Sequence, residues 1–289
     1  MIPRSWLFVP ADDPAKLDKA WASGAEAVIL DLEDSVAPAR KAEARVNARD
    51  FLKRRGQGGP QAWVRVNALS SGLIDDDLHW VVQGAPDGIV LPKPDSAKAI
   101  ERMNDKLDRL EVAHQVRMGS VHILPIATET PRSLFALDTY ADLPEGGRVI
   151  GLTWGAEDLP AAVGADSGRH EDGSFTDLCR VARALCLAAG AAAGLPVLET
   201  VFPAHKDLEG LKAFAEQSRR EGFQGMLAIH PDQVEIINAA YTPSEKSLER
   251  ARRIVALFQA NPGVGVMSMD GEMVDAPHLA QARRILAQA

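Results

Sequence analysis

The sequence predicts a (β/α)₈ barrel, the TIM-barrel fold, followed by a helical extension at the carboxyl end. Short apolar runs recur along the chain, segments of helical character lie between them, and most runs are continuous rather than alternating. Continuous runs are typical of strands covered on both faces, and the alternation of strand and helix is typical of a parallel sheet. We therefore expect a barrel domain over residues 1–243 and a helical extension over residues 244–289.

The predicted strands are the apolar runs at residues 5–10, 27–33, 62–67, 88–93, 121–129, 149–155, 197–203 and 225–231. Helical segments lie between them, for example at residues 14–24, 95–113 and 206–222, and Gly222 is suited to end the last of these. Eight strand–helix repeats favour a closed barrel over an open sheet. A Rossmann domain is disfavoured because no GxGxxG motif follows the first strand.

The carboxyl-terminal segment is longer than a barrel requires. Residues 244–261 predict a helix, residues 262–275 are rich in turn-forming residues, and a last helix is predicted from residue 276 to the end. This extension either covers one end of the barrel or reaches another subunit. Within the barrel, the polar and glycine-rich residues 164–175 predict a loop at the catalytic end.

Composition narrows the function classes. The net charge is −8, and no long basic tract occurs, which argues against nucleic-acid binding. No apolar run approaches the ~20 residues of a membrane helix, and the first residues lack the pattern of a signal peptide, so we expect a cytoplasmic protein. Cys179 and Cys186 lie seven residues apart on a predicted apolar helix, where we expect two packed thiols.

Ionisable side chains follow almost every predicted strand. They are Asp31, Glu33, Asp34, Arg65, Lys93, Glu129, Glu157, Asp158, His205 and His230. Because the carboxyl ends of barrel strands form the active site, we expect these side chains to converge there. Carboxylates in one place repel each other unless a cation compensates, and oxygen ligands favour Mg²⁺ or Mn²⁺ over zinc. Arg65 is the best candidate for holding a carboxylate or carbonyl oxygen.

Several motifs together carry a family resemblance. RSWLFVPADDPAK, AVILDLEDSV, VRVN, IVLPKP, ATETPRSL, TWGAEDL, AIHPDQV and GEMVDAP occur in this order. The chain thereby resembles the citrate lyase β-subunit-like (CitE-like) family of the HpcH/HpaI aldolase superfamily, from residue 4 to about residue 280. The resemblance implies a (β/α)₈ barrel and Mg²⁺-dependent cleavage of a 3-hydroxy-3-carboxy acyl-CoA thioester, of the citramalyl, malyl or citryl type, into acetyl-CoA and a keto acid.

The resemblance also implies roles for single residues. The metal ligands fall on Glu129 and Asp158, and Glu129 also faces the substrate. The substrate-binding and catalytic arginine falls on Arg65, and a catalytic acid falls on Asp275. Relatives supply this acid from a neighbouring subunit, which implies a homo-oligomer, commonly a trimer, with the extension packing on a neighbour. Contacts to the CoA part of the substrate fall on the basic residues Lys19, Arg40 and Lys41.

The acidic stretch after the second strand is left with a supporting role. Because two other strands supply the metal carboxylates, we expect Glu33 and Asp34 to orient Arg65 or metal-bound waters. Asp31 is expected to brace the barrel mouth. Pairing of Arg65 with Asp31 or Glu33 is the structural alternative to substrate binding by this arginine.

The chain departs from the family pattern in two places. Thr128 stands where relatives usually have an apolar residue, and PAHKD at residues 203–207 replaces a DFKD-like segment. His205 therefore marks a place where substrate preference can differ. Two other activities stay open: a metal-dependent aldolase acting on free 2-keto acids, and a citrate lyase β subunit acting only on a carrier-bound thioester within a complex.

Overall fold

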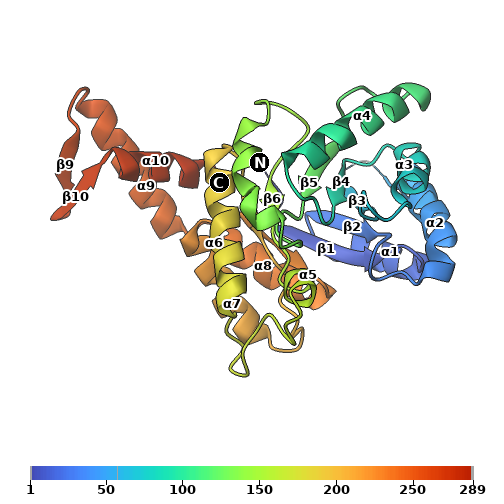
Figure 1. The fold of residues 1–289 in the computed structure, drawn as a ribbon. Coiled ribbons are helices and arrows are strands. Elements are labelled where there is room, and N and C mark those ends of the chain that lie inside the picture. Colours follow the sequence, from blue (N-terminus) through green and yellow to red (C-terminus); the bar gives the residue numbers. More distant parts are fainter. Residues whose placement is uncertain (1, 57, 288–289) are drawn as a thin grey trace. The chain divides into compact units, whose positions relative to one another are not determined.

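A computed structural model describes residues 2–56 and 58–287 of the chain (Figure 1). The chain divides into two compact units. The barrel unit comprises Ile2–Asn238, and the tail unit begins at Ala239. The last two residues of the predicted final helix, 288 and 289, lie outside the described residues.

The barrel unit alternates strands with helices. Its strands are β1 (Ser5–Pro10), β2 (Ala27–Asp31), β3 (Gln61–Arg65), β4 (Gly88–Leu91), β5 (His122–Pro125), β6 (Leu152–Thr153), β7 (Val197–Glu199) and β8 (Gly225–Ala228). The α-helices are α1 (Pro14–Trp21), α2 (Lys41–Arg54), α3 (Ile74–Val82), α4 (Ala97–Ala113), α5 (Asp158–Ala162), α6 (Asp177–Ala192), α7 (Leu208–Glu221) and α8 (Val234–Tyr241). Short 3₁₀ turns are η1 (Pro38–Arg40), η2 (Ser133–Phe135), η3 (Leu137–Asp142) and η4 (Pro231–Gln233).

The strands form one parallel sheet that curves into a barrel. The order of the eight strands is β5-β4-β3-β2-β1-β8-β7-β6, and each neighbouring pair runs parallel. Between β5 and β6, isolated bridges join Ile123 to Val149 and Ile126 to Thr153 in place of a continuous ladder. We call this junction the β5–β6 seam. The predicted (β/α)₈ barrel is confirmed, with a seam where the ring closes.

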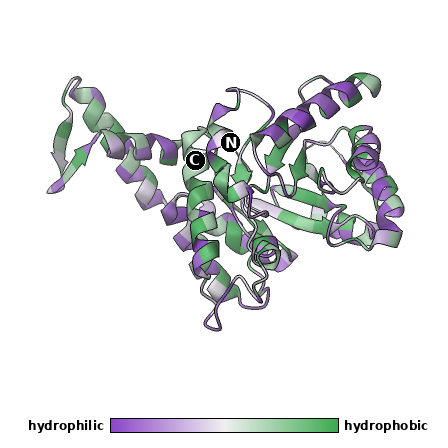
Figure 2. Cartoon of the chain, viewed as in Figure 1, coloured by the Kyte–Doolittle hydropathy of each residue, from purple (hydrophilic) through white to green (hydrophobic). Residues whose placement is uncertain are grey.

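Apolar side chains from the strands fill the barrel. Figure 2 shows the strands as hydrophobic, whereas the surrounding helices carry both hydrophobic and hydrophilic residues. Trp6 and Trp63 are fully buried and meet edge to face, with ring centroids 5.0 Å apart. A side chain at Gly88 would place its Cβ 2.1 Å from the Trp63 ring, so this strand position requires glycine. Large aromatic groups therefore take the place of several smaller side chains in the core.

A buried ion pair supports the wall near the seam. Arg148, which precedes β6, donates from Nη1 to Glu111 Oε1 at 2.8 Å and from Nη2 to Oε2 at 2.5 Å. Glu111 is fully buried and also accepts backbone N–H groups of Gly119 and Val121. Burial opposes the charge of Glu111, but the hydrogen bonds from Arg148 and the backbone outweigh it and hold the pKa of this carboxyl below its ordinary value.

Replacing Arg148 with Met is expected to destabilise the fold by about 3–5 kcal/mol at neutral pH, because Glu111 is left buried without its partner. Since the folded-state pKa of Glu111 lies below its unfolded value, the stabilisation is complete above the ordinary carboxyl range. It is lost as pH falls through the folded pKa, so the gap between wild type and variant narrows below about pH 4. Urea unfolding at several pH values measures this. A gap that stays constant from pH 7 to pH 3 contradicts the pairing, and Glu111→Gln combined with Arg148→Met should recover part of the loss.

The tail unit has a small core of its own. It contains α9 (Glu245–Ala260), β9 (Val266–Met269), β10 (Glu272–Asp275) and α10 (Ala276–Leu286). The two strands pair antiparallel, and both turn residues between them, Asp270 and Gly271, have positive φ angles of 54° and 81°. Ile254, Met269 and Val274 are buried together. The two helices agree with the predicted ones, but the hairpin was not predicted.

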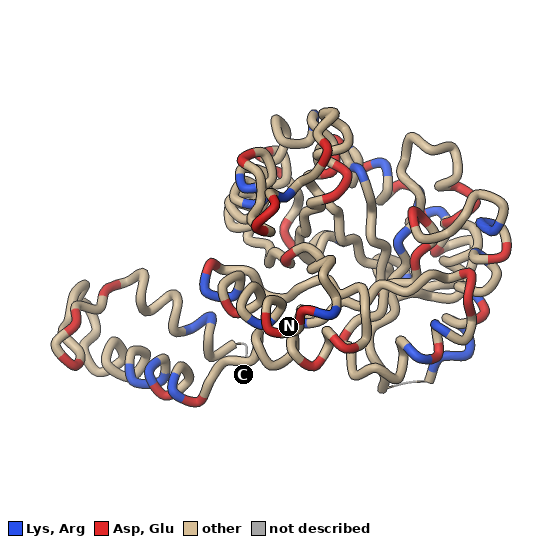
Figure 3. Tube along the Cα trace, turned by 90° about the horizontal axis from the view of Figure 1, so that it is seen from below, with Lys and Arg blue, Asp and Glu red and all other residues tan. Residues whose placement is uncertain are grey.

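Acidic and basic residues occur in both units. Figure 3 shows acidic and basic residues interspersed along the helices. In the described part of the chain, no helix combines the length and the apolar character that a bilayer crossing needs.

Candidate active site

Arg65, at the end of β3, is held by Asp31, at the end of β2. The two residues are register partners in the sheet. Arg65 Nε donates to Asp31 Oδ1 at 2.7 Å, and Nη2 donates to Oδ2 at 2.6 Å. Nη1 lies 3.3 Å from Glu33 Oε2, and the guanidinium carbon lies 4.7 Å from the centroid of the Phe8 ring. Two of the three guanidinium nitrogens are thus engaged by Asp31, and Nη1 is the one directed to other groups.

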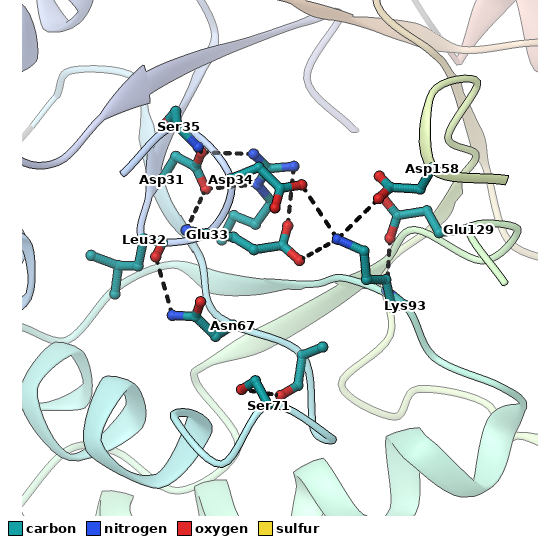
Figure 4. A network of polar contacts seen from close by, with 12 residues as sticks. Asp31, Leu32, Glu33, Asp34, Ser35, Asn67, Ser71, Lys93, Glu129 and Asp158 are labelled. Atoms are coloured by element: carbon teal, nitrogen blue, oxygen red, sulfur yellow. Dashed lines mark hydrogen bonds and ion pairs between the residues drawn. The ribbon is translucent and has the colours of Figure 1, made fainter. Parts of the chain in front are cut away.

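Lys93, which follows β4, contacts carboxylates from three different strands (Figure 4). Its ammonium lies 2.7 Å from Glu33 Oε1, 3.3 Å from Asp34 Oδ2 and 3.1 Å from Asp158 Oδ1. Its backbone N–H donates to Glu129 Oε2 at 2.7 Å. Its φ angle is 52°, a left-handed conformation that is uncommon for a residue with a Cβ. Such constrained backbone often marks a functional position.

Glu129 and Asp158 come from opposite sides of the β5–β6 seam. Glu129 follows β5 and is buried, and Asp158 follows β6 and opens α5 with its side chain 30% exposed. Gly155 leaves room for Glu129, because a Cβ there would lie 2.7 Å from Glu129 Cγ. Thr128, the departure noted in the sequence, is buried and its hydroxyl accepts the N–H of Gly155 at 3.2 Å. A hydroxyl at position 128 therefore ties the two sides of the seam together beside the carboxylates.

The carboxylates influence one another strongly. Burial, and then the nearby charges of Asp158 and Glu33, raise the pKa of Glu129 well above its usual range. Burial also raises the pKa of Glu33, although Arg65 and Lys93 oppose the shift. At Asp31 burial acts in the same direction, but the hydrogen bonds and the charge of Arg65 outweigh it and hold the pKa below its ordinary value. The charged form of Glu129 is thus disfavoured by burial and also by the neighbouring carboxylates.

This donor set fits a hard divalent cation. Glu129 and Asp158 offer carboxylate oxygens, and Mg²⁺ is typically bound by one or two carboxylates together with water and substrate oxygens. Within residues 2–56 and 58–287, no group of three His, Cys, Asp or Glu side chains is arranged as a protein-only metal site. Burial contributes most to the raised pKa of Glu129, and a divalent cation would offset the repulsion that Asp158 and Glu33 add to it. The site therefore fits Mg²⁺ or Mn²⁺ and does not fit zinc.

The three basic residues expected to contact CoA differ in their surroundings. Lys41, at the start of α2, donates to the carbonyl oxygens of Leu32 and Glu33 at 2.7 and 2.6 Å. Arg40 is half exposed and pairs with Asp12 at 2.9 Å. Lys19 lies exposed in the last turn of α1, farther along the helix from the strand ends. Arg40 and Lys41 therefore lie beside the carboxyl end of β2, and Lys19 is set apart from them.

The expected acid Asp275 belongs to the tail unit. It is the last residue of β10 and the N-cap of α10, and its Oδ1 lies 2.5 Å from His278 Nδ1. This contact fixes the orientation of the carboxyl group within the tail unit. Its catalytic role stays a prediction.

The two histidines at the barrel mouth lie together. His205, after β7, and His230, after β8, have ring centroids 5.2 Å apart. His230 Nδ1 accepts the N–H of Asp232 at 3.2 Å, as a structural histidine would. Sequence reasoning gave no role to Phe8, which the structure places against Arg65. The aromatic Phe8 near the end of the first strand was the available sequence signal for this contact. Its partner Arg65 lies two strands away, so the sequence does not show that the two side chains meet.

Residues 4–231 match the profile of the HpcH/HpaI aldolase/citrate lyase family. The chain belongs to this family. A citrate lyase subunit beta-like protein of Mycobacterium tuberculosis is 34% identical over 284 residues, which cover 98% of this chain and 94% of the relative. A (3S)-malyl-CoA thioesterase of Cereibacter sphaeroides is 32% identical over 290 residues, covering 99% of this chain and 94% of the relative.

A solved structure of the family is similar over almost the full length. It is CitE from Mycobacterium tuberculosis in complex with magnesium, acetoacetate and coenzyme A. The TM-score is 0.78 at 33% sequence identity, with 99% of this chain and 97% of the other covered. The predicted CitE-like resemblance is confirmed, and membership of the HpcH/HpaI aldolase/citrate lyase family makes the chain a carbon–carbon lyase.

Proposed function

We propose that this protein is a Mg²⁺-dependent lyase that cleaves a 3-hydroxy-3-carboxy acyl-CoA thioester into acetyl-CoA and a keto acid. The observation that carries the proposal is the pair Glu129 and Asp158 at the barrel mouth, which Lys93 contacts with its backbone N–H and its ammonium, and to which Glu33 links Arg65 through Lys93. The CitE structure that holds magnesium, acetoacetate and coenzyme A supports both the cofactor and the CoA thioester as substrate. Citramalyl-, malyl- and citryl-CoA are the candidate substrates.

Glu129 and Asp158 would hold the divalent ion, with Mn²⁺ as an alternative to Mg²⁺. When bound there, the ion supplies Lewis-acid polarisation of the oxygen that becomes the keto group. The protein's own part is to bring one buried and one partly exposed carboxylate together across the seam. Glu33 contacts both Lys93 and Arg65, and it thereby holds Lys93 where it contacts these two carboxylates.

A base takes the proton of the substrate hydroxyl as the carbon–carbon bond breaks, and Arg65 is suited to stabilise the thioester enolate that leaves. Asp31 holds the guanidinium from one edge, so that its remaining nitrogen, Nη1, can donate to the developing oxyanion. A donor that is already oriented costs no reorganisation during the reaction. The proton that the enolate carbon then takes up is assigned to Asp275 of a neighbouring copy, acting as general acid in a homo-oligomer, expected to be a trimer.

The CoA part of the substrate is assigned to the rim of the mouth beside α2. Arg40 and Lys41 lie there, and they are suited to bind phosphate groups. Lys19 is assigned only a peripheral contact with CoA, because it lies in the last turn of α1, away from Arg40 and Lys41.

A panel of CoA thioesters tests the proposal. Purified protein with Mg²⁺ is given citramalyl-, malyl- and citryl-CoA, and keto-acid release and free-thiol release are measured separately. We expect a keto acid to appear without free CoA thiol, because cleavage leaves the thioester intact. Thiol release without a keto acid would identify a thioesterase, as one relative is named. Activity only on a carrier-bound thioester, or only on free 2-keto acids, would overturn the proposed substrate class.

A further inference from the structure

We propose that Lys93 is the built-in counter-cation of the divalent-ion site: a positioning residue whose ammonium holds Asp158 and Glu33 together and competes with the divalent ion for Asp158. The inference rests on the divalent site of the proposed function. It adds a residue that neither binds the metal nor acts on the substrate in that proposal. Its basis is the set of contacts that Lys93 makes with both its backbone and its side chain.

The backbone around Lys93 is built to serve Glu129. Lys93 lies between Pro92 and Pro94, which have no N–H groups, so its N–H is the sole backbone donor of the three residues. That N–H points at Glu129 Oε2, 2.7 Å away. The left-handed φ angle of 52° is unfavourable for a lysine, and it also directs the side chain into the carboxylate cluster. The conformation therefore serves two contacts with the same site.

The charges around Lys93 are unbalanced without it. Five carboxylates lie in the cluster: Asp31, Glu33, Asp34, Glu129 and Asp158. Arg65 is engaged by Asp31 through two nitrogens and reaches Glu33 with the third, whereas the ammonium of Lys93 contacts Glu33, Asp34 and Asp158. It is 27% exposed, compared with 14% for the Arg65 side chain. When no divalent ion is bound, Lys93 therefore relieves the repulsion that Asp158 and Asp34 add to the cluster, while Arg65 offsets the charge of Asp31 and part of that of Glu33.

The distances and burial distinguish the contact that anchors the Lys93 ammonium from the contacts that a divalent ion can replace. The shortest contact of the ammonium, 2.7 Å, is with Glu33, whose side chain is only 6% exposed. The contacts with Asp158 and Asp34 are longer, at 3.1 and 3.3 Å, and involve more exposed carboxylates. Glu33 thus anchors the ammonium, which reaches toward Asp158. A divalent ion can take Asp158 from Lys93 without releasing Lys93 from Glu33.

The direction in which divalent-ion affinity changes when Lys93 is replaced separates this role from a merely structural one. A positive charge beside a metal ligand weakens the attraction for a divalent cation, so a neutral residue at position 93 should bind the ion more tightly. At the same time the metal-free protein should become less stable, because the carboxylates then repel each other. A residue that only supports the local structure would weaken metal binding when replaced.

The experiment measures Mn²⁺ affinity by electron paramagnetic resonance and thermal unfolding with and without Mg²⁺. Lys93→Met should lower the Kd for Mn²⁺ by about tenfold and should enlarge the rise in Tm caused by Mg²⁺. Lys93→Gly, which accepts the positive φ angle, should behave in the same way. Lys93→Arg keeps the charge and should stay within about threefold of wild type. Lys98→Met removes the same charge from an exposed position of α4 and should leave both measurements unchanged.

The results also separate this inference from the proposed function. If wild type binds Mn²⁺ and both neutral variants bind it equally or more weakly, the role of Lys93 is overturned and the divalent site stands. If wild type binds no Mn²⁺, or Asp158→Asn binds it as well as wild type does, the divalent site itself fails, and the inference fails with it. Tighter binding in Lys93→Met and in Lys93→Gly supports the inference whether or not a CoA thioester is cleaved.

Discussion

Replacing Glu129 with Gln, or Asp158 with Asn, is expected to reduce Mg²⁺-dependent cleavage by about 10³-fold or more. Each change removes one of the two carboxylates that the site offers to the ion, and Lewis-acid stabilisation of a developing oxygen charge contributes several kcal/mol to a barrier. Gln and Asn keep the size of the side chain, so Gly155 and Lys93 retain their contacts around Glu129. The loss should appear in kcat and in divalent-ion affinity together.

A neighbouring residue provides the matched control. Glu157 precedes Asp158 in the same motif and is exposed, so Glu157→Gln should retain activity within a few-fold of wild type while removing the same charge. Steady-state rates over a range of Mg²⁺ concentrations, together with isothermal titration, measure both effects. If Asp158→Asn is no worse than Glu157→Gln, Asp158 is not a ligand of a catalytic ion.

Asp275→Asn is expected to keep the divalent-ion affinity of wild type and to lose about 10²- to 10⁴-fold in turnover, the range typical of a lost general acid. The barrel carboxylates are untouched by this change. The amide still can cap α10, where the aspartate now stands, so the tail unit should remain folded. Normal Mn²⁺ binding with near-normal turnover in this variant would remove Asp275 from the mechanism.

A mixing experiment tests whether Asp275 acts in the site of another copy. Chains carrying Arg65→Gln and chains carrying Asp275→Asn are each expected to be inactive alone. In a mixed homo-oligomer, about one quarter of the sites combine an intact barrel with an intact tail from a neighbour. Recovery of about that share of activity supports the exchange between subunits. No recovery, with mixing verified by mass spectrometry, would place Asp275 in its own chain's site or outside catalysis.

The strands could be predicted because burial on both faces leaves a continuous apolar run. Each of the eight predicted runs overlaps a strand, but in every run after the first the strand ends earlier than the run. The run at 121–129 keeps its ladder only from His122 to Pro125, and the run at 149–155 keeps only Leu152–Thr153. Apolar content shows that a segment is buried, and it does not show where pairing stops. For that reason the β5–β6 seam could not be predicted from the sequence.

The tail hairpin could have been predicted. Asp270 and Gly271 form a DG pair at the turn, with alternating residues on both sides, which is a strong hairpin signal. The proline and glycines of residues 262–275 make the segment turn-rich in composition, and this masks the alternation.

Within the site, the acids followed from their positions after strands, and pairing of Arg65 with Asp31 or Glu33 was among the expectations, but the geometry of the contacts could not be predicted. The pairing of Arg65 with Asp31 depends on the register of β2 against β3, and the reach of Lys93 depends on one left-handed φ angle. Neither quantity is encoded in a local residue pattern that one sequence reveals.

The β5–β6 seam has a consequence for the mechanical integrity of the ring. The barrel has its least continuous strand pairing at this seam, where isolated bridges and the Thr128 hydroxyl connect the two sides. Glu129 and Asp158 lie on its two edges, so a divalent ion bound by both would also link the two sides of the barrel. Binding of the ion should then also stabilise the seam against local unfolding.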